Sequence, residues 1–113
     1  MARGISFQQA AMAVGAVVAQ VAGVNESEFN PLQQTSRVSL FAAATVDGGS
    51  ATLKLGSDVH ISDFRLPVAA AVSTRDHLVA TGLATRGAKV TVGLRNQGVA
   101  ASTVNGYVVI EPV

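Results

Sequence analysis

Residues 88–96 read AKVTVGLRN, and the alternation of apolar and polar side chains in this stretch decides the fold class. Three apolar residues occupy one side of the alternation, namely Val90, Val92 and Leu94. Polar and charged residues occupy the other side, namely Lys89, Thr91 and Arg95. Because successive side chains of a β-strand point to opposite faces of a sheet, this pattern predicts a strand with one buried face and one solvated face.

Similar patterns fill most of the chain between residues 37 and 111, with turn residues between them at short intervals. Residues 47–50 (DGGS) form one such turn, and Leu53 and Leu55 point inward from the segment after it. We expect that segment to form a hairpin with the strand before the turn. The expected strands are 38–46, 51–55, a segment around Val59 and Ile61, 77–84, 88–96 and 99–111.

Glycines interrupt two of these patterns. Gly82 predicts a β-bulge, and Asn105-Gly106 predicts either a bulge or a second tight turn. Six or seven short strands with turns about every 8–12 residues are typical of a β-sandwich. We therefore expect a mainly β domain over residues 37–113, a sandwich of the jelly-roll-like or immunoglobulin-like kind.

Residues 1–24 differ in composition from the rest of the chain. From Ala10 to Val24 the sequence is apolar except for Gln20 and carries no charge. This run is shorter than the roughly 17–25 residues that span a membrane, and Arg3 is a weak basic start for a secretory signal. We therefore expect an N-terminal α-helical arm that packs on protein, and we do not favour membrane contact. A polar linker over 25–36 would join the arm to the β domain.

Small residues recur at every fourth position along this expected helix. Such ridges allow close approach between helix backbones. A helix that is apolar on nearly all sides must be buried or must sit in an assembly, although an alanine-rich helix also produces this spacing by chance. The candidate assembly contacts are Ala11, Gly15, Ala19 and Gly23.

The overall composition excludes several classes of protein. Hydrophobic residues make up 49% of the chain, charged residues 13% and aromatic residues 4%, the net charge is +1, and there is no cysteine. This composition excludes a disordered chain, a disulfide framework and a polybasic nucleic-acid binder. The low charge beside the high apolar content predicts a surface that is covered by a partner.

The polar residues do not form a recognisable catalytic or metal-binding motif. Asp58, His60 and Ser62 would share one strand face, but Asp58 and His60 supply two ligands where a metal site needs three or four. Asp63 and Asp76 are the other acids near enough in sequence for a carboxylate pair, and Asp76 is more simply a turn residue. We therefore expect no catalytic, cofactor-binding or metal-binding residues, and a protein that is not an enzyme.

In its general character, the chain resembles small virion structural proteins of bacteriophages, either capsid-lattice or capsid-decorating subunits. The resemblance lies in the length, the alanine- and valine-rich, cysteine-free composition, and an N-terminal arm before a compact β domain. Residues 88–96 and 107–110 are also similar to the last hairpin of immunoglobulin-like modules. The resemblance implies a homo-oligomer in the virion that also contacts other capsid proteins. Since the arm carries Arg3 as its single cation, we do not expect direct nucleic-acid binding.

A second interpretation is an extracellular adhesin or glycan-binding β-sandwich. Residues 1–24 would then be an uncleaved export signal or an anchor. An assembly of many symmetric copies in the native source favours the virion interpretation, whereas a secreted monomer without these residues favours the adhesin.

Overall fold

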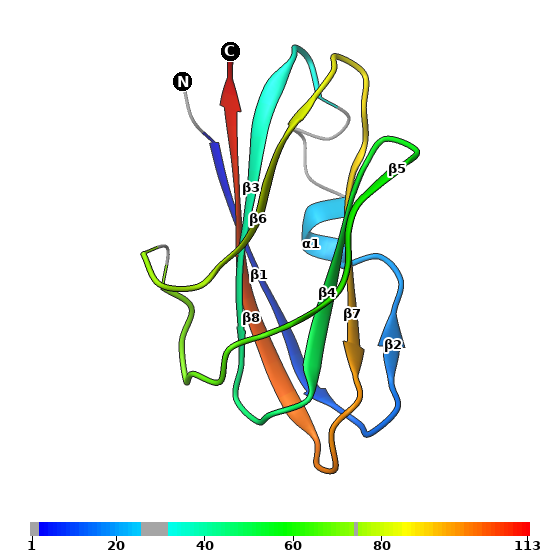
Figure 1. The fold of residues 1–113 in the computed structure, drawn as a ribbon, viewed down its shortest axis with the longest axis vertical. Coiled ribbons are helices and arrows are strands. Elements are labelled where there is room, and N and C mark those ends of the chain that lie inside the picture. The colour runs from blue at the N-terminus through cyan, green and yellow to red at the C-terminus, as the bar shows by residue number, and fades with distance from the viewer. Residues whose placement is uncertain (1–2, 26–31, 74) are drawn as a thin grey trace.

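Antiparallel strand pairing accounts for most of the ordered backbone. The computed structural model describes residues 3–25, 32–73 and 75–113, and within them eight strands form two four-stranded sheets that pack face to face (Figure 1). The first sheet, called sheet A, has the order β1 (Arg3–Met12), β8 (Ser102–Pro112), β3 (Ser36–Ala44) and β6 (Leu78–Ala84). The second, called sheet B, has the order β2 (Val17–Val18), β7 (Val90–Asn96), β4 (Gly49–Leu55) and β5 (Asp58–Arg65).

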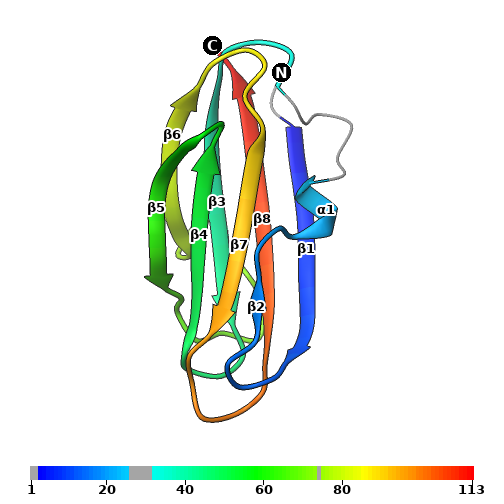
Figure 2. The same ribbon diagram turned by 90° about the vertical axis from the view of Figure 1, so that its right-hand side faces the viewer.

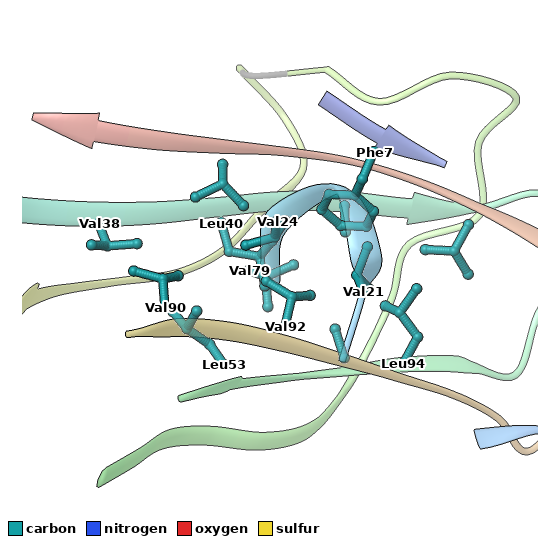
Figure 3. Packing of buried hydrophobic residues seen from close by; sticks show 14 of the residues in the cluster. Phe7, Val21, Val24, Val38, Leu40, Leu53, Val79, Val90, Val92 and Leu94 are labelled. Atoms are coloured by element: carbon teal, nitrogen blue, oxygen red, sulfur yellow. The ribbon is translucent and has the colours of Figure 1, made fainter. Parts of the chain in front are cut away.

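The core lies between the two sheets and is built from small and medium-sized apolar side chains. Val90, Val92 and Leu94 of β7 are buried, whereas Lys89 and Arg95 are exposed, so the predicted faces of this strand are confirmed. Figure 3 shows these β7 residues and Leu53 of β4 facing residues of sheet A. The prediction of a mainly β sandwich is therefore confirmed.

The predicted helical arm is wrong. Residues 3–12 form strand β1, which pairs antiparallel with β8 at the edge of sheet A. The described part of residues 1–24 otherwise contributes the short strand β2 and the start of α1 (Ala22–Asn25), a helix of four residues. Ile5 and Phe7 alternate with Ser6 and Gln8 in this strand, which suits an edge with one buried face. Among the described residues, no helix is long and apolar enough to cross a membrane.

Helix α1 closes one open side of the sandwich. It packs against both β1 and β7, and Figure 2 shows it beside β1. Val24 is fully buried, and the Val21 N–H donates to the Val92 carbonyl at 2.8 Å. Part of the apolar run that suggested a helical arm therefore fills the core. Of the expected linker 25–36, residues 26–31 lie outside the described residues, Leu32 is buried and Ser36 already belongs to β3.

Two predicted hairpins are wrong. The turn after β3 carries the chain from sheet A to β4 in sheet B, and the connection from β7 to β8 crosses back to sheet A. A glycine-rich turn reverses the chain equally well toward a neighbouring strand or toward the facing sheet, so its composition did not distinguish the two. Among consecutive strands, β4 and β5 do pair side by side.

Glycines in β1 and β8 make room for aromatic rings on both faces of sheet A. Phe7 of β1 lies over Gly106 on the buried face, where a Cβ atom would overlap its ring. Tyr107 of β8 lies over Gly4 on the outer face in the same way. Asn105-Gly106 is therefore neither a bulge nor a turn, because β8 runs through it without interruption. The bulge expected at Gly82 is also displaced, because the register of β3 and β6 shifts between Leu40 and Phe41.

Candidate assembly surface

The four small residues proposed as assembly contacts do not share a helix face. Ala11 lies in an irregular part of β1 with a φ of 47°, and Gly15 lies in the turn before β2 with a φ of 81°. Ala19 follows β2, and Gly23 lies in α1. All four are exposed, so a contact with a partner stays a prediction for each of them, but the helical ridge does not exist.

Three connections meet at one end of the sandwich, which is the lower end in Figure 1. They are residues 13–16 between β1 and β2, 45–48 between β3 and β4, and 97–101 between β7 and β8. Asn96 joins two of them, because its main chain donates to the Ala16 carbonyl and accepts from the Gly15 N–H, at 3.0 and 2.9 Å. The Gln97 N–H donates to the Gly48 carbonyl at 2.8 Å and so joins the third.

Side chains and close backbone packing hold the same loops further. The Ser102 hydroxyl lies 3.3 Å from both the main-chain nitrogen and the oxygen of Val46. Gly48 and Gly98 lie against each other so closely that a Cβ atom on either would overlap backbone. The three loops are therefore fixed by contacts that do not need a partner.

Residues 13–16 and 97–101, which we call the apolar tip, present apolar side chains on this fixed backbone. Val99 is 97% exposed and Val14 is 55% exposed. Ala13, Ala100 and Ala101 are exposed as well, and neither loop carries a charged residue. Exposed apolar surface on a monomer commonly marks a contact site, and a fixed backbone lowers the entropic cost of binding.

A surface ion pair lies beside the apolar tip. Arg65 donates to both carboxylate oxygens of Asp47, at 3.1 Å from Nε and 2.8 Å from Nη2. The hydrogen bond and the positive charge of Arg65 lower the pKa of the Asp47 carboxyl below its ordinary value. Both groups are exposed, so the pair contributes little to stability, and Arg65 offsets the charge of the Asp47 carboxylate.

His60 has a structural role that the sequence did not reveal. Its Nε2 donates to the Thr81 carbonyl at 2.7 Å, and its ring lies against Gly82. The bond joins β5 at the edge of sheet B to β6 at the edge of sheet A. A Cβ atom at Gly82 would lie 2.8 Å from the imidazole ring, so this glycine leaves room for the ring and does not form the expected bulge.

The acidic residues considered for chemistry are dispersed. Asp58 lines an open hollow of about 460 Å³ together with His60 and Arg86. Asp63 lies 4.0 Å from Arg95 on the outer side of sheet B. Asp76 lies in the loop before β6. In that loop Ser73 is the capping side chain, because its hydroxyl accepts from the Asp76 N–H at 3.3 Å. Within the described residues, no three metal-binding side chains come together.

Comparisons with known proteins add little to these observations. No protein family matches the chain, and no curated protein does. One similar solved structure is the infectious bursal disease virus VP2 subviral particle, at 12% identity and a TM-score of 0.47 over 99% of this chain. The chain spans 32% of that viral chain, about a third. Another is a protein of Bacillus endospore appendages that form disulfide-linked pili, at 13% identity and a TM-score of 0.40, covering 100% of this chain and 88% of the other. Similarities this weak say nothing about what the chain does.

Proposed function

We propose that the chain is a non-enzymatic structural subunit of a viral particle, of the capsid-lattice or capsid-decorating kind found in bacteriophages. It acts by symmetric self-assembly, with other capsid proteins as further partners and the virion as its location. The observation that carries this proposal is the apolar tip, in which Val99 is 97% exposed on a loop fixed by hydrogen bonds.

Exposure of the tip valines to water is energetically unfavourable. Burial of a valine side chain stabilises a complex by about 1.5–3 kcal/mol. In the isolated subunit Val99 gains almost nothing from this effect and Val14 gains only part of it, whereas a neighbouring copy would cover both. Closed symmetric assembly is the commonest arrangement for soluble homo-oligomers. Because the tip carries no charge, two copies of it can meet without electrostatic repulsion.

The test is the mass of the full chain in solution, measured by size-exclusion chromatography with light scattering over a range of concentrations. We expect the wild type to form oligomers, and the double variant Val14→Ser/Val99→Ser to lose the larger species. Val59→Ser is the matched control, because Val59 is similarly exposed, at 54%, but lies on β5 away from the tip. Circular dichroism should show the same β spectrum for all three proteins.

A stable monomer at high micromolar concentration would overturn the assembly proposal. If that monomer also bound immobilised glycans, the adhesin interpretation would replace it. If Val59→Ser reduced assembly as much as the tip variant did, the contact would not lie at the tip.

A further inference from the structure

The outer face of sheet A carries an ordered array of side chains that the core does not use. The strand register arranges them in three rows across the sheet. The first row contains Glu111, Arg37 and Leu83. The middle row contains Gly4, Val109, Ser39 and Thr81. The third row contains Ser6, Tyr107, Phe41 and Leu78.

The connection between β5 and β6 covers part of the next row of this face, in which Ala43 and Asn105 lie beneath it and Gln8 of β1 stays exposed. Val68 lies beside Ala44 in the plane of the sheet, where the Ala44 N–H donates to the Pro67 carbonyl at 3.0 Å and the Ala69 N–H donates to the Ala44 carbonyl at 2.9 Å. The chain then passes over the outer face, where the Asn105 side-chain amide donates to the Ala70 carbonyl at 3.4 Å. Ala43, which would belong to a fourth row, is fully buried as a result. Figure 1 shows this loop standing out from the sheet on its outer side. Over β8, β3 and β6 the free part of the face is therefore limited to three rows and ends at a step.

Large apolar side chains dominate the free rows. Leu83 is 66% exposed and Leu78 is 49% exposed, and Phe41 and Tyr107 are partly exposed. The Tyr107 ring lies along the sheet over Gly4 of the edge strand β1, which places it toward the β1 side of the middle row. The charges are confined to the first row, and within the described residues Arg37 and Glu111 form no ion pair.

We propose that a second copy of this chain covers this face, about a two-fold axis that crosses the strands at the middle row. The loop between β5 and β6 stands out from the face, and this protrusion distinguishes the proposed axis from the alternative one. A two-fold axis parallel to the strands would place the loops of both copies at the same level, where they would collide. The crossing axis places each loop beyond the opposite end of the other copy.

The proposed axis brings chemically suited rows together. The first row of each copy lies on the third row of the other, so Arg37 faces the partner subunit's Phe41 and Leu83 faces the partner subunit's Leu78. A guanidinium over an aromatic face is a favourable contact, and the leucines bury each other. At the axis itself, Val109 faces the partner's Val109 between small residues of the middle row.

This inference rests on the proposed function in one respect, because both require contacts between copies. The inference adds that the unit of assembly is a dimer, in which the two apolar tips lie at opposite ends. An isologous contact closes on itself, so it cannot extend an assembly. The tips then supply the second contact that a lattice of dimers needs.

The first experiment measures sedimentation velocity on the full chain carrying Val14→Ser and Val99→Ser, in which the tip contact is removed. We expect this protein to be a dimer. Adding Val109→Lys should weaken the dimer by at least about 100-fold, because two lysines would be buried against each other at the axis. Adding Thr91→Lys, on the outer side of sheet B, is the matched control and should leave the dimer unchanged.

The second experiment uses the absence of cysteine from the chain. The first and third rows lie four residues apart along β3, about 13 Å, which is too far for a disulfide. Under oxidation, Leu83→Cys mixed with Leu78→Cys should therefore give a crosslinked dimer, whereas either variant alone should not. Equal crosslinking in the single variants and in the mixture would overturn the proposed axis.

The outcomes separate this inference from the proposed function. If the tip variant is monomeric while the wild type assembles, the face-to-face dimer is wrong and self-assembly stands. If the wild type and the tip variant are both dimers and nothing larger forms, the dimer stands and the proposed assembly role fails.

Discussion

The side-chain amide of Asn96 donates a hydrogen bond to the main-chain oxygen of Met12 at 2.9 Å, and so ties the end of β7 to the end of β1. The same amide nitrogen donates to the Ala100 carbonyl at 3.0 Å, and the amide oxygen accepts from the Gly98 N–H at 3.0 Å. Asn96 is almost completely buried. One polar side chain therefore holds both loops of the apolar tip.

We predict that Asn96→Ala lowers the free energy of unfolding by about 2–4 kcal/mol, because three main-chain groups lose a buried partner. Urea denaturation followed by circular dichroism measures the loss. Gln97→Ala is the matched control, since Gln97 is the exposed neighbour. Equal effects of the two substitutions would contradict the role assigned to Asn96.

Gly106→Ala should cost about 1–3 kcal/mol, because its Cβ would overlap the Phe7 ring and force it to move. Gly23→Ala is the control, as a Cβ there lies 3.7 Å from Phe7 Cβ, an ordinary contact. Phe7→Leu replaces the ring by a smaller side chain, so Gly106→Ala should then lower the free energy of unfolding by less. A double-mutant cycle in thermal unfolding measures this coupling. If the effects of the two substitutions on the free energy of unfolding simply added, the Phe7 ring would not be what the Cβ atom at position 106 displaces.

Val92→Asp should unfold the protein, at a cost of more than about 4 kcal/mol, because it places an unpaired charge in the fully buried core. Lys89→Ala, at the exposed start of the same segment, should be nearly neutral. Far-ultraviolet circular dichroism and thermal unfolding distinguish the two. A tolerated Val92→Asp would mean that the register of β7 is shifted by one residue.

The ion pair of Asp47 and Arg65 predicts a specific pH dependence. The folded-state pKa of Asp47 is lowered by Arg65, so its stabilising contribution is present at neutral pH and is lost as the pH falls through that lowered value. The stability difference between the wild type and Asp47→Asn should therefore vanish in acid and shrink in high salt. In Arg65→Gln, a carboxyl NMR titration should show that the pKa of Asp47 has returned toward its ordinary value. An unchanged titration in that variant would exclude Arg65 as the cause.

Strand β7 could be predicted because it has one buried and one solvated face. In β7 the alternation of Val90 and Val92 with Thr91 marks both the strand and its inner side. The pairing of strands was harder to predict, because a turn such as 47–50 has the same composition whether the chain stays in one sheet or crosses to the other.

The N-terminal part could not be predicted from its own residues. Short apolar runs are compatible with a helix or a strand, and β1 is decided by the free edge of β8, which lies about a hundred residues away in sequence. The candidate site was missed for a related reason. Val99 was assigned to the last strand, and the role of Asn96 depends on loops that come together only in the folded chain.

The pairing of β1 with β8 also fixes when these surfaces can exist. Gln8 and Asn105 are hydrogen-bonded across 97 positions of the chain, so sheet A cannot be completed while the ribosome is still making β8. Val99 of the apolar tip and Tyr107 of the outer face both follow β1 to β7 in the sequence, so they are synthesised after those seven strands. A chain whose synthesis has not yet reached β8 therefore presents neither complete contact surface to its neighbours on the polysome.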